Sequence, residues 1–159
     1  MRLSEISISG QALTELMETA FAKRASLRFQ VNGFSMSPFI QDNDIITVSP
    51  TVDSPIELGR PVGFIHPVTK KLVIHRVVDE RNGGYVIKGD NIFQVDGLIP
   101  KEDILGCVTK IERNGKSVRI GLGLLGPAIA FLSRIKLLPL LGRSFVLFPK
   151  RKNQGLFSF

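Results

Sequence analysis

Short runs of apolar and β-branched residues, each ended by Gly, Pro, Asn or Asp, restrict the folds open to this chain more than any other feature. Runs of this length predict β-strands, and the residues between them predict tight turns. We expect seven strands, at residues 27–31, 44–48, 61–65, 71–78, 85–88, 104–111 and 117–120. The run 71–78 should pair with 61–65 as a hairpin through the turn 66–70. The predicted fold class is mainly β, a compact, curled antiparallel sheet.

One amphipathic helix is predicted before the sheet. Between residues 11 and 24 the apolar side chains recur at the spacing of a single helix face: Leu13, Leu16, Met17, Ala20 and Phe21. Packing against the sheet is the expected role of this face, and contact with a membrane surface is the alternative. The chain therefore divides into an N-terminal helical segment, residues 1–26, a β-domain, residues 27–119, and a C-terminal segment, residues 120–159.

The C-terminal segment is apolar and basic. From Arg113 onward the chain has nine Lys or Arg and no acid, so the remainder contributes about −2 to the net charge of +7. The residues between these charges are mainly Leu, Ile, Phe, Gly and Pro, which favours an anionic lipid surface over nucleic acid. We therefore expect a membrane surface, and no nucleic acid, as the partner of residues 120–159.

The uncharged part of that segment is short for a membrane span. Residues 120–133 carry no charge, which gives 14 residues where a spanning helix needs roughly 20. An interfacial or re-entrant membrane segment is the preferred interpretation, ahead of a true span and of a buried core helix. This predicts a membrane-associated protein, at the cytoplasmic membrane, with the side of the membrane left open.

Cysteine and histidine are too few for a disulfide framework or a zinc cluster. The chain has one cysteine, Cys107, set in an apolar run, and two histidines. A buried hydrophobic role is therefore expected for Cys107, and no metal or cofactor is predicted.

A serine, a histidine and two acids provide the parts of an activated nucleophile. Ser35 lies in a loop bounded by Gly and Pro, His75 lies within a strand, and Asp90 and Asp96 follow in what reads as a turn. A serine hydroxyl needs a base to accept its proton, and histidine titrates in the right range. Either acid could hold the far nitrogen of the histidine ring and stabilise the imidazolium.

The sequence around these residues resembles type I signal peptidases. Five ordered motifs carry the resemblance: GFSMSP at 33–38, NDIITV at 43–48, VIHRV at 73–77, KGDN at 88–91 and LGCV at 105–108. They look most like the serine-histidine branch of the endoplasmic reticulum, archaea and some Gram-positive bacteria, and they cover roughly residues 27–111. The resemblance is also to the related LexA-like self-cleaving peptidases, which share the β-fold.

The resemblance implies a serine endopeptidase that cleaves a leader or signal segment of an extended peptide or protein, after small residues. It implies Ser35 as nucleophile, His75 as base and Asp96 as the acid of the triad, with Asp90 as support. The Ser35 backbone N–H would serve as oxyanion donor, since Gly33 replaces the serine that some bacterial relatives use. From the first residues we expect neither an export signal nor the N-terminal transmembrane anchor that is typical of the family.

Two other functions stay open. A LexA-like self-cleaving peptidase would use a lysine base and a cleavable Ala-Gly bond, and no Ala-Gly pair precedes Ser35. A catalytically inactive, membrane-associated adaptor would use only the C-terminal segment. The simplest alternative is that these side chains have structural roles: Ser35 as a turn residue, His75 in the core, Asp90 shaping a turn, Arg76 in an ion pair, and His66 and Ser37 in loops. Lys88 is the one alternative to His75 as the catalytic base, and its position in a turn disfavours it.

Overall fold

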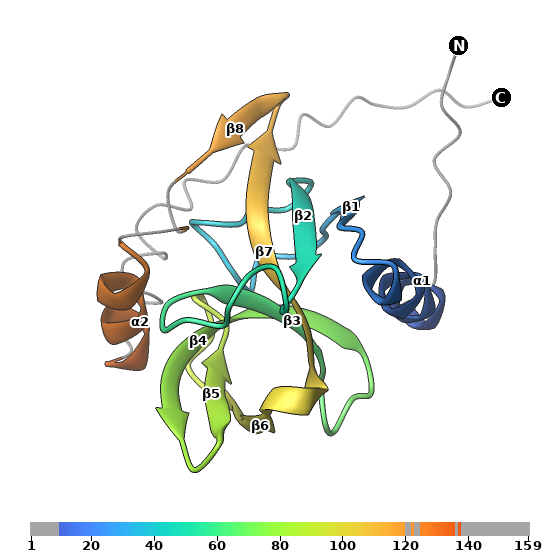
Figure 1. Ribbon diagram of the computed structural model, residues 1–159. Helices are drawn as coiled ribbons and strands as arrows, with labels where there is room; N and C mark the ends of the chain where they lie inside the picture. Colours follow the sequence, from blue (N-terminus) through green and yellow to red (C-terminus); the bar gives the residue numbers. More distant parts are fainter. Residues whose placement is uncertain (1–9, 120–121, 123–124, 136, 138–159) are drawn as a thin grey trace, which may run out of the picture.

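The computed structural model describes residues 10–119, 122, 125–135 and 137 of the chain. A curled antiparallel sheet dominates it, with one helix on either side (Figure 1). The elements in chain order are α1 (Gly10–Ala22), β1 (Leu27–Gln30), β2 (Ile45–Pro50), β3 (Pro61–Ile65), β4 (Leu72–Arg81), β5 (Gly84–Lys88), β6 (Val95–Pro100), the 3₁₀ turn η1 (Lys101–Asp103), β7 (Ile104–Arg113), β8 (Lys116–Val118) and α2 (Gly126–Arg134).

The eight strands form one open sheet in the order β1-β2-β7-β3-β4-β5-β6, and β8 pairs with β7 outside that path. Every pairing is antiparallel. Long β7 pairs with both β2 and β3, and its registers with each contain a shift, which bends the sheet at that point. The mainly β prediction is confirmed, and among the described residues β1 and β6 lie at the two ends of the strand order.

Each of the seven predicted strands is present, with ends that shift by a few residues. The predicted hairpin is also present: β3 and β4 pair from Pro61↔Arg76 to Ile65↔Leu72. The eighth strand, β6, was missed, and Asp96 lies on it rather than in a turn. The segment was not recognised as a strand because it contains Gly97 and Pro100, and both residue types are depleted in sheets. Gly97 has φ of +124°, next to a register shift in the pairing with β5.

Two apolar clusters fill the curl of the sheet. The first gathers inward side chains of β3 to β7: Val62, Phe64, Val77, Tyr85, Ile87, Ile99, Ile104 and Cys107. The second joins α1 and the 33–40 loop to β2 and β7: Met17, Met36, Ile40, Ile46, Val48, Val108 and Ile111. The expected burial of Cys107 is confirmed, since its side chain is fully enclosed. Phe64, which packs beside His75, belongs to the first cluster, and Met36, which follows Ser35, belongs to the second. The candidate site therefore lies where the two clusters meet.

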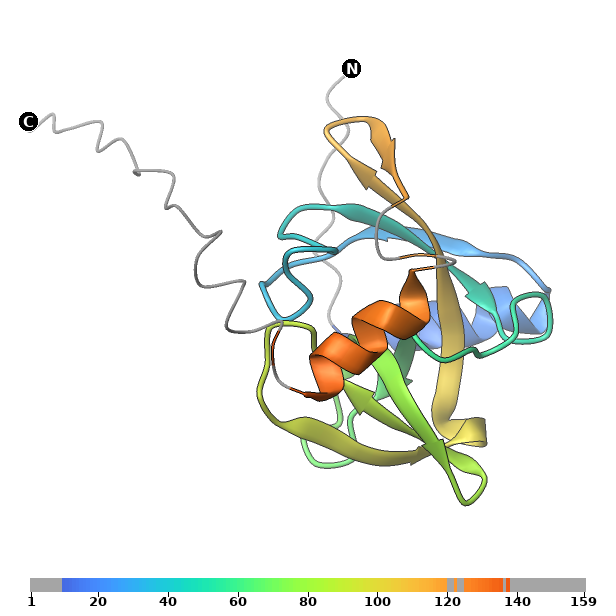
Figure 2. The same ribbon diagram turned by 90° about the vertical axis from the view of Figure 1, so that its left-hand side faces the viewer.

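The helices lie on opposite sides of the sheet (Figure 2). The predicted N-terminal helix is α1, and it buries Met17 completely, so packing on the domain is its observed role. From the C-terminal segment, α2 buries Ile129, Ala130 and Ser133 against the domain and leaves Phe131 exposed. Within the described part of the chain, no helix has the length and apolar character needed to cross a membrane. Most of the C-terminal segment, including all of it from residue 138 onward, lies outside the described residues.

Candidate active site

The loop that carries Ser35 is fastened at both ends. At its start, Gly33 takes φ of +108°, a conformation that glycine adopts without steric cost, and its N–H donates to Asp42 Oδ1 at 2.8 Å. Past Ser35, the buried Met36 side chain enters the second core cluster, and its carbonyl accepts from the Ile40 N–H at 3.0 Å. The loop is thus held by one buried apolar side chain and by local hydrogen bonds, and Ser35 on it is partly exposed.

A second segment, the turn after β5, holds the same loop from the other side. The Asn91 N–H donates to the Ser35 carbonyl at 2.8 Å, and the Asn91 side-chain amide donates to the Phe34 carbonyl at 3.2 Å. These bonds tie the GFSMSP and KGDN motifs together across more than fifty residues of sequence. They leave the Ser35 N–H unused, since no hydrogen bond from it is found in the described part of the chain.

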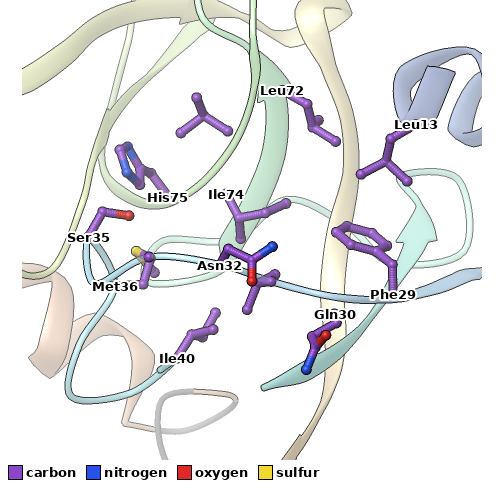
Figure 3. A pocket seen from close by; sticks show the side chains of 13 residues that line it. Leu13, Phe29, Gln30, Asn32, Ser35, Met36, Ile40, Leu72, Ile74 and His75 are labelled. Carbon is purple, nitrogen blue, oxygen red and sulfur yellow. The ribbon is translucent and has the colours of Figure 1, made fainter. Parts of the chain in front are cut away.

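Ser35 and His75 lie at one end of a cavity of about 420 Å³. Figure 3 shows the two side chains next to each other there, with Leu13 of α1 and Phe29 of β1 at the opposite end. Most of the lining is apolar and comes from α1, β1, the Ser35 loop and β4: Leu13, Phe29, Val31, Met36, Ile40, Leu72, Val73 and Ile74. The cavity therefore offers an apolar surface that leads to a hydroxyl and an imidazole.

His75 is held from behind by Asp96. The His75 Nδ1 atom lies 2.7 Å from Asp96 Oδ2, and both side chains are at least nine-tenths buried. A carboxylate in this position accepts a hydrogen bond from Nδ1–H, so the proton of a neutral ring stays on Nδ1 and Nε2 is unprotonated. His75 comes from the middle of β4 and Asp96 from β6, on opposite sides of β5. The curl of the sheet is what brings these two side chains into contact.

The free nitrogen of His75 faces the Ser35 loop across Gly89. A Cβ atom added to Gly89 would lie 3.0 Å from His75 Nε2 and 2.9 Å from the Ser35 carbonyl oxygen. Both atoms therefore border one small space beside Gly89, which only a residue without a side chain leaves open. Among the described residues no hydrogen bond joins Ser35 Oγ to His75 Nε2. Rotation about the single side-chain torsion of serine redirects Oγ, and catalytic hydrogen bonds often tighten only when substrate is bound.

Asp90 has a different partner. Its carboxylate accepts from Arg76 Nε at 2.8 Å and from Arg76 Nη2 at 2.6 Å, and both side chains are completely buried. Burial raises the pKa of Asp90, and the Arg76 guanidinium offsets only part of that effect. Arg76 Nη1 also donates to the Gly59 carbonyl at 2.6 Å. The predicted ion pair of Arg76 is confirmed, and it occupies the acid that the sequence offered as a support for His75.

Lys88 is also committed elsewhere. Its buried ammonium donates to its neighbour's carbonyl, Gly89 O, at 3.0 Å and to Ser133 Oγ of α2 at 3.1 Å. The serine of α2 is fully buried, so the helix covers the back of the turn that holds the Ser35 loop. The C-terminal segment was expected to contact a membrane surface. In the structure its helix α2 also contacts the domain, through the hydrogen bond between Ser133 and Lys88 next to the candidate site.

Of the four site residues predicted from the sequence, Ser35 and His75 line one end of the cavity, Asp96 lies behind His75, and Asp90 pairs with Arg76 instead. The sequence did not predict that Asn91 holds the Ser35 loop or that Gly89 leaves space beside His75, although both residues lie in the KGDN motif. Contacts with a distant loop leave no periodic signal in a sequence. In the described ranges no cluster of three or more His, Cys, Asp or Glu is arranged to hold a metal ion. Comparison of the whole chain with protein-family models and with curated proteins finds no match.

Proposed function

We propose that this protein is a serine endopeptidase of the signal-peptidase type, which cleaves an extended leader segment. The observation that carries the proposal is the 2.7 Å contact between His75 Nδ1 and Asp96 Oδ2, at the cavity end that Ser35 also lines. A buried imidazole with a carboxylate on one nitrogen and a serine loop beside the other is the arrangement that activates a hydroxyl.

In the proposed reaction, Ser35 Oγ attacks the scissile carbonyl carbon and His75 Nε2 takes the hydroxyl proton. Asp96 stabilises the imidazolium formed in this step. The Ser35 N–H, which is free of other hydrogen bonds in the described structure, would donate to the developing oxyanion. His75 then gives its proton to the leaving amine, and water hydrolyses the acyl-enzyme ester by the reverse sequence of proton transfers.

The walls of the cavity support an extended peptide as substrate. Residues 72–75 of β4 pair with β3 on one side, whereas pairing with β5 begins only at Arg76. β1, on the opposite wall, is an edge strand. Two strand segments with unused backbone groups thus border an apolar cavity, and a peptide can add to such edges as a further strand. Its scissile bond would then lie beside Ser35.

The base favoured by this geometry is His75 and not Lys88, whose ammonium donates to Gly89 and Ser133. This speaks against the LexA-like alternative, which needs a lysine base. Membrane association through residues 120–159 stays part of the proposal. Its support is the apolar, basic composition of that segment, together with the exposed Phe131 on α2 and the exposed Leu125 directly before it.

The test uses the full chain in detergent, a fluorogenic leader peptide with small residues at the cleavage site, and a fluorophosphonate probe for activated serines. Wild-type protein should cleave the peptide and take up the probe, and Ser35→Ala should do neither. Ser37→Ala is the matched control, since Ser37 lies in the same loop, and it should keep most of the activity. Equal cleavage by wild type and Ser35→Ala, or no probe uptake by folded wild type, would refute the proposal and favour an inactive adaptor.

A further inference from the structure

A second histidine lies on the far side of Asp96. His66 Nε2 is 3.8 Å from Asp96 Oδ1, while His75 Nδ1 is 2.7 Å from Asp96 Oδ2. The carboxylate therefore lies between two imidazoles, with one oxygen toward each. Within the described part of the chain no other side chain forms a hydrogen bond or ion pair with Asp96. His66 was expected to be an ordinary loop residue.

The turn between β3 and β4 determines which nitrogen of His66 carries the proton. The backbone N–H groups of Val68 and Thr69 both donate to His66 Nδ1, each at 3.2 Å. A ring nitrogen that accepts hydrogen bonds must hold a lone pair, so Nδ1 is unprotonated and the proton of the neutral ring lies on Nε2. That N–H is the group that faces Asp96 Oδ1.

The separation of 3.8 Å is too long for a hydrogen bond and short enough for a favourable interaction between an N–H dipole and a carboxylate in a poorly hydrated place. The Asp96 side chain is 10% exposed and that of His66 is 20% exposed, so water screens this contact only in part. If Asp96 rotated toward solvent, it would lose both histidine contacts together.

The two imidazoles also share one apolar wall. The Phe64 ring centroid lies 6.4 Å from that of His66 and 6.4 Å from that of His75. Phe64 is fully buried in the first core cluster, so it is a fixed surface for both rings. The orientation of His66 is thus determined by the turn at Nδ1 and by Phe64, and does not depend on Asp96.

From this geometry we propose that His66 is a positioning residue for the triad of the proposed function. Its Nε2–H holds the Asp96 carboxylate in the orientation that presents Oδ2 to His75 Nδ1. The simpler alternative is that His66 only shapes its turn through Nδ1. The two roles use different ring nitrogens, so two substitutions separate them.

His66→Asn keeps an acceptor near the position of Nδ1 and removes the donor toward Asp96. His66→Gln places an amide N–H near the position of Nε2 and gives up the acceptor for the turn. With the leader-peptide assay, we expect His66→Asn to keep wild-type thermal stability and KM. It should lower kcat about tenfold, because a less well-oriented Asp96 positions His75 less precisely. His66→Gln should lower thermal stability and restore most of kcat.

Nitrogen-15 NMR of histidine-labelled protein gives a readout that needs no enzymatic activity. Wild type should show His66 protonated at Nε2, and a His75 Nδ1 proton protected from solvent exchange by Asp96. Exchange of that proton should be faster in His66→Asn and near wild type in His66→Gln. An absence of peptidase activity in wild type would count against the proposed function alone, because these NMR signals report on the positioning of Asp96 directly.

Three results would overturn the inference. The first is a His66 ring protonated at Nδ1. The second is a folded His66→Asn variant with wild-type kcat and wild-type exchange at His75. The third is an equal loss of kcat in both variants that follows their loss of stability, which would assign His66 to the turn only.

Discussion

Replacing Asp90 and Asp96 in turn should separate stability from catalysis. Asp90→Asn removes the charge that faces Arg76, whose side chain is fully buried and cannot turn to water. The asparagine keeps one oxygen acceptor, but its amide hydrogens would point at guanidinium N–H groups now 2.6 to 3.1 Å from the carboxylate oxygens. Breaking one partner of a buried ion pair costs about 3–5 kcal/mol. We expect the free energy of unfolding to fall by that amount.

Asp96→Asn should leave stability nearly unchanged and lower kcat strongly. Its carboxylate faces no guanidinium among the described residues, and an asparagine keeps a hydrogen bond to His75 Nδ1, so the free energy of unfolding should change by only about 1 kcal/mol. An amide in that place can donate to His75 Nδ1 and so favours the wrong tautomer of the ring. In a triad this lowers kcat by a factor on the order of 10⁴.

Urea unfolding followed by circular dichroism measures the first quantity, since the chain has no tryptophan for fluorescence. Leader-peptide cleavage at a low temperature, where Asp90→Asn is still folded, measures the second. Glu57→Gln is the stability control: its ion pair with Arg60 is exposed on the Glu57 side, and such pairs contribute about 0–1 kcal/mol. The double variant Arg76→Met/Asp90→Leu should recover part of the loss, because an unpaired buried charge causes most of it.

An exchange of phenotypes between the two variants would refute the roles assigned to Asp90 and Asp96. Stability of Asp90→Asn within about 1 kcal/mol of wild type, together with loss of kcat in the folded protein, would make Asp90 the acid of the triad. Full activity of Asp96→Asn would refute the assignment of Asp96 directly.

Two further predictions concern the surroundings of the site and the core. Gly89→Ala should lower kcat about 100-fold in a folded protein, because the new methyl group would force His75 Nε2 and the Ser35 loop apart; wild-type kcat in a peptide-cleavage assay would show that the space is not needed. Burial raises the pKa of Cys107 to about 11, so at pH 8 only about a thousandth of the thiol is ionised. Iodoacetamide should modify it only upon unfolding, as followed by intact mass, and rapid labelling of native protein would contradict its burial.

Local sequence was sufficient for most of the secondary structure. Short apolar, β-branched runs and the turn residues between them predicted seven strands and the β3–β4 hairpin, because both features are properties of neighbouring residues. The single apolar face of α1 predicted a helix packed on the domain for the same reason. β6 was not predicted because Gly97 and Pro100 break the local pattern, whereas in the structure this segment pairs with β5 as an extended strand.

The partners of the charged residues were decided by the tertiary structure. Alternation along β4 already separates His75 from Arg76, since neighbouring strand residues point to opposite faces. Which acid meets each of them depends on how the sheet curls and on the turn after β5, which brings Asp90 to Arg76 and Asp96 to His75. Tertiary structure also brings His66 to Asp96 and Ser133 to Lys88. These two residues lie in a turn and a helix outside the motifs that predicted the site. Sequence therefore determined which chemical groups this protein has, and the curled sheet determined which of them touch, because contacts between distant residues depend on strand register and curvature that no local pattern encodes.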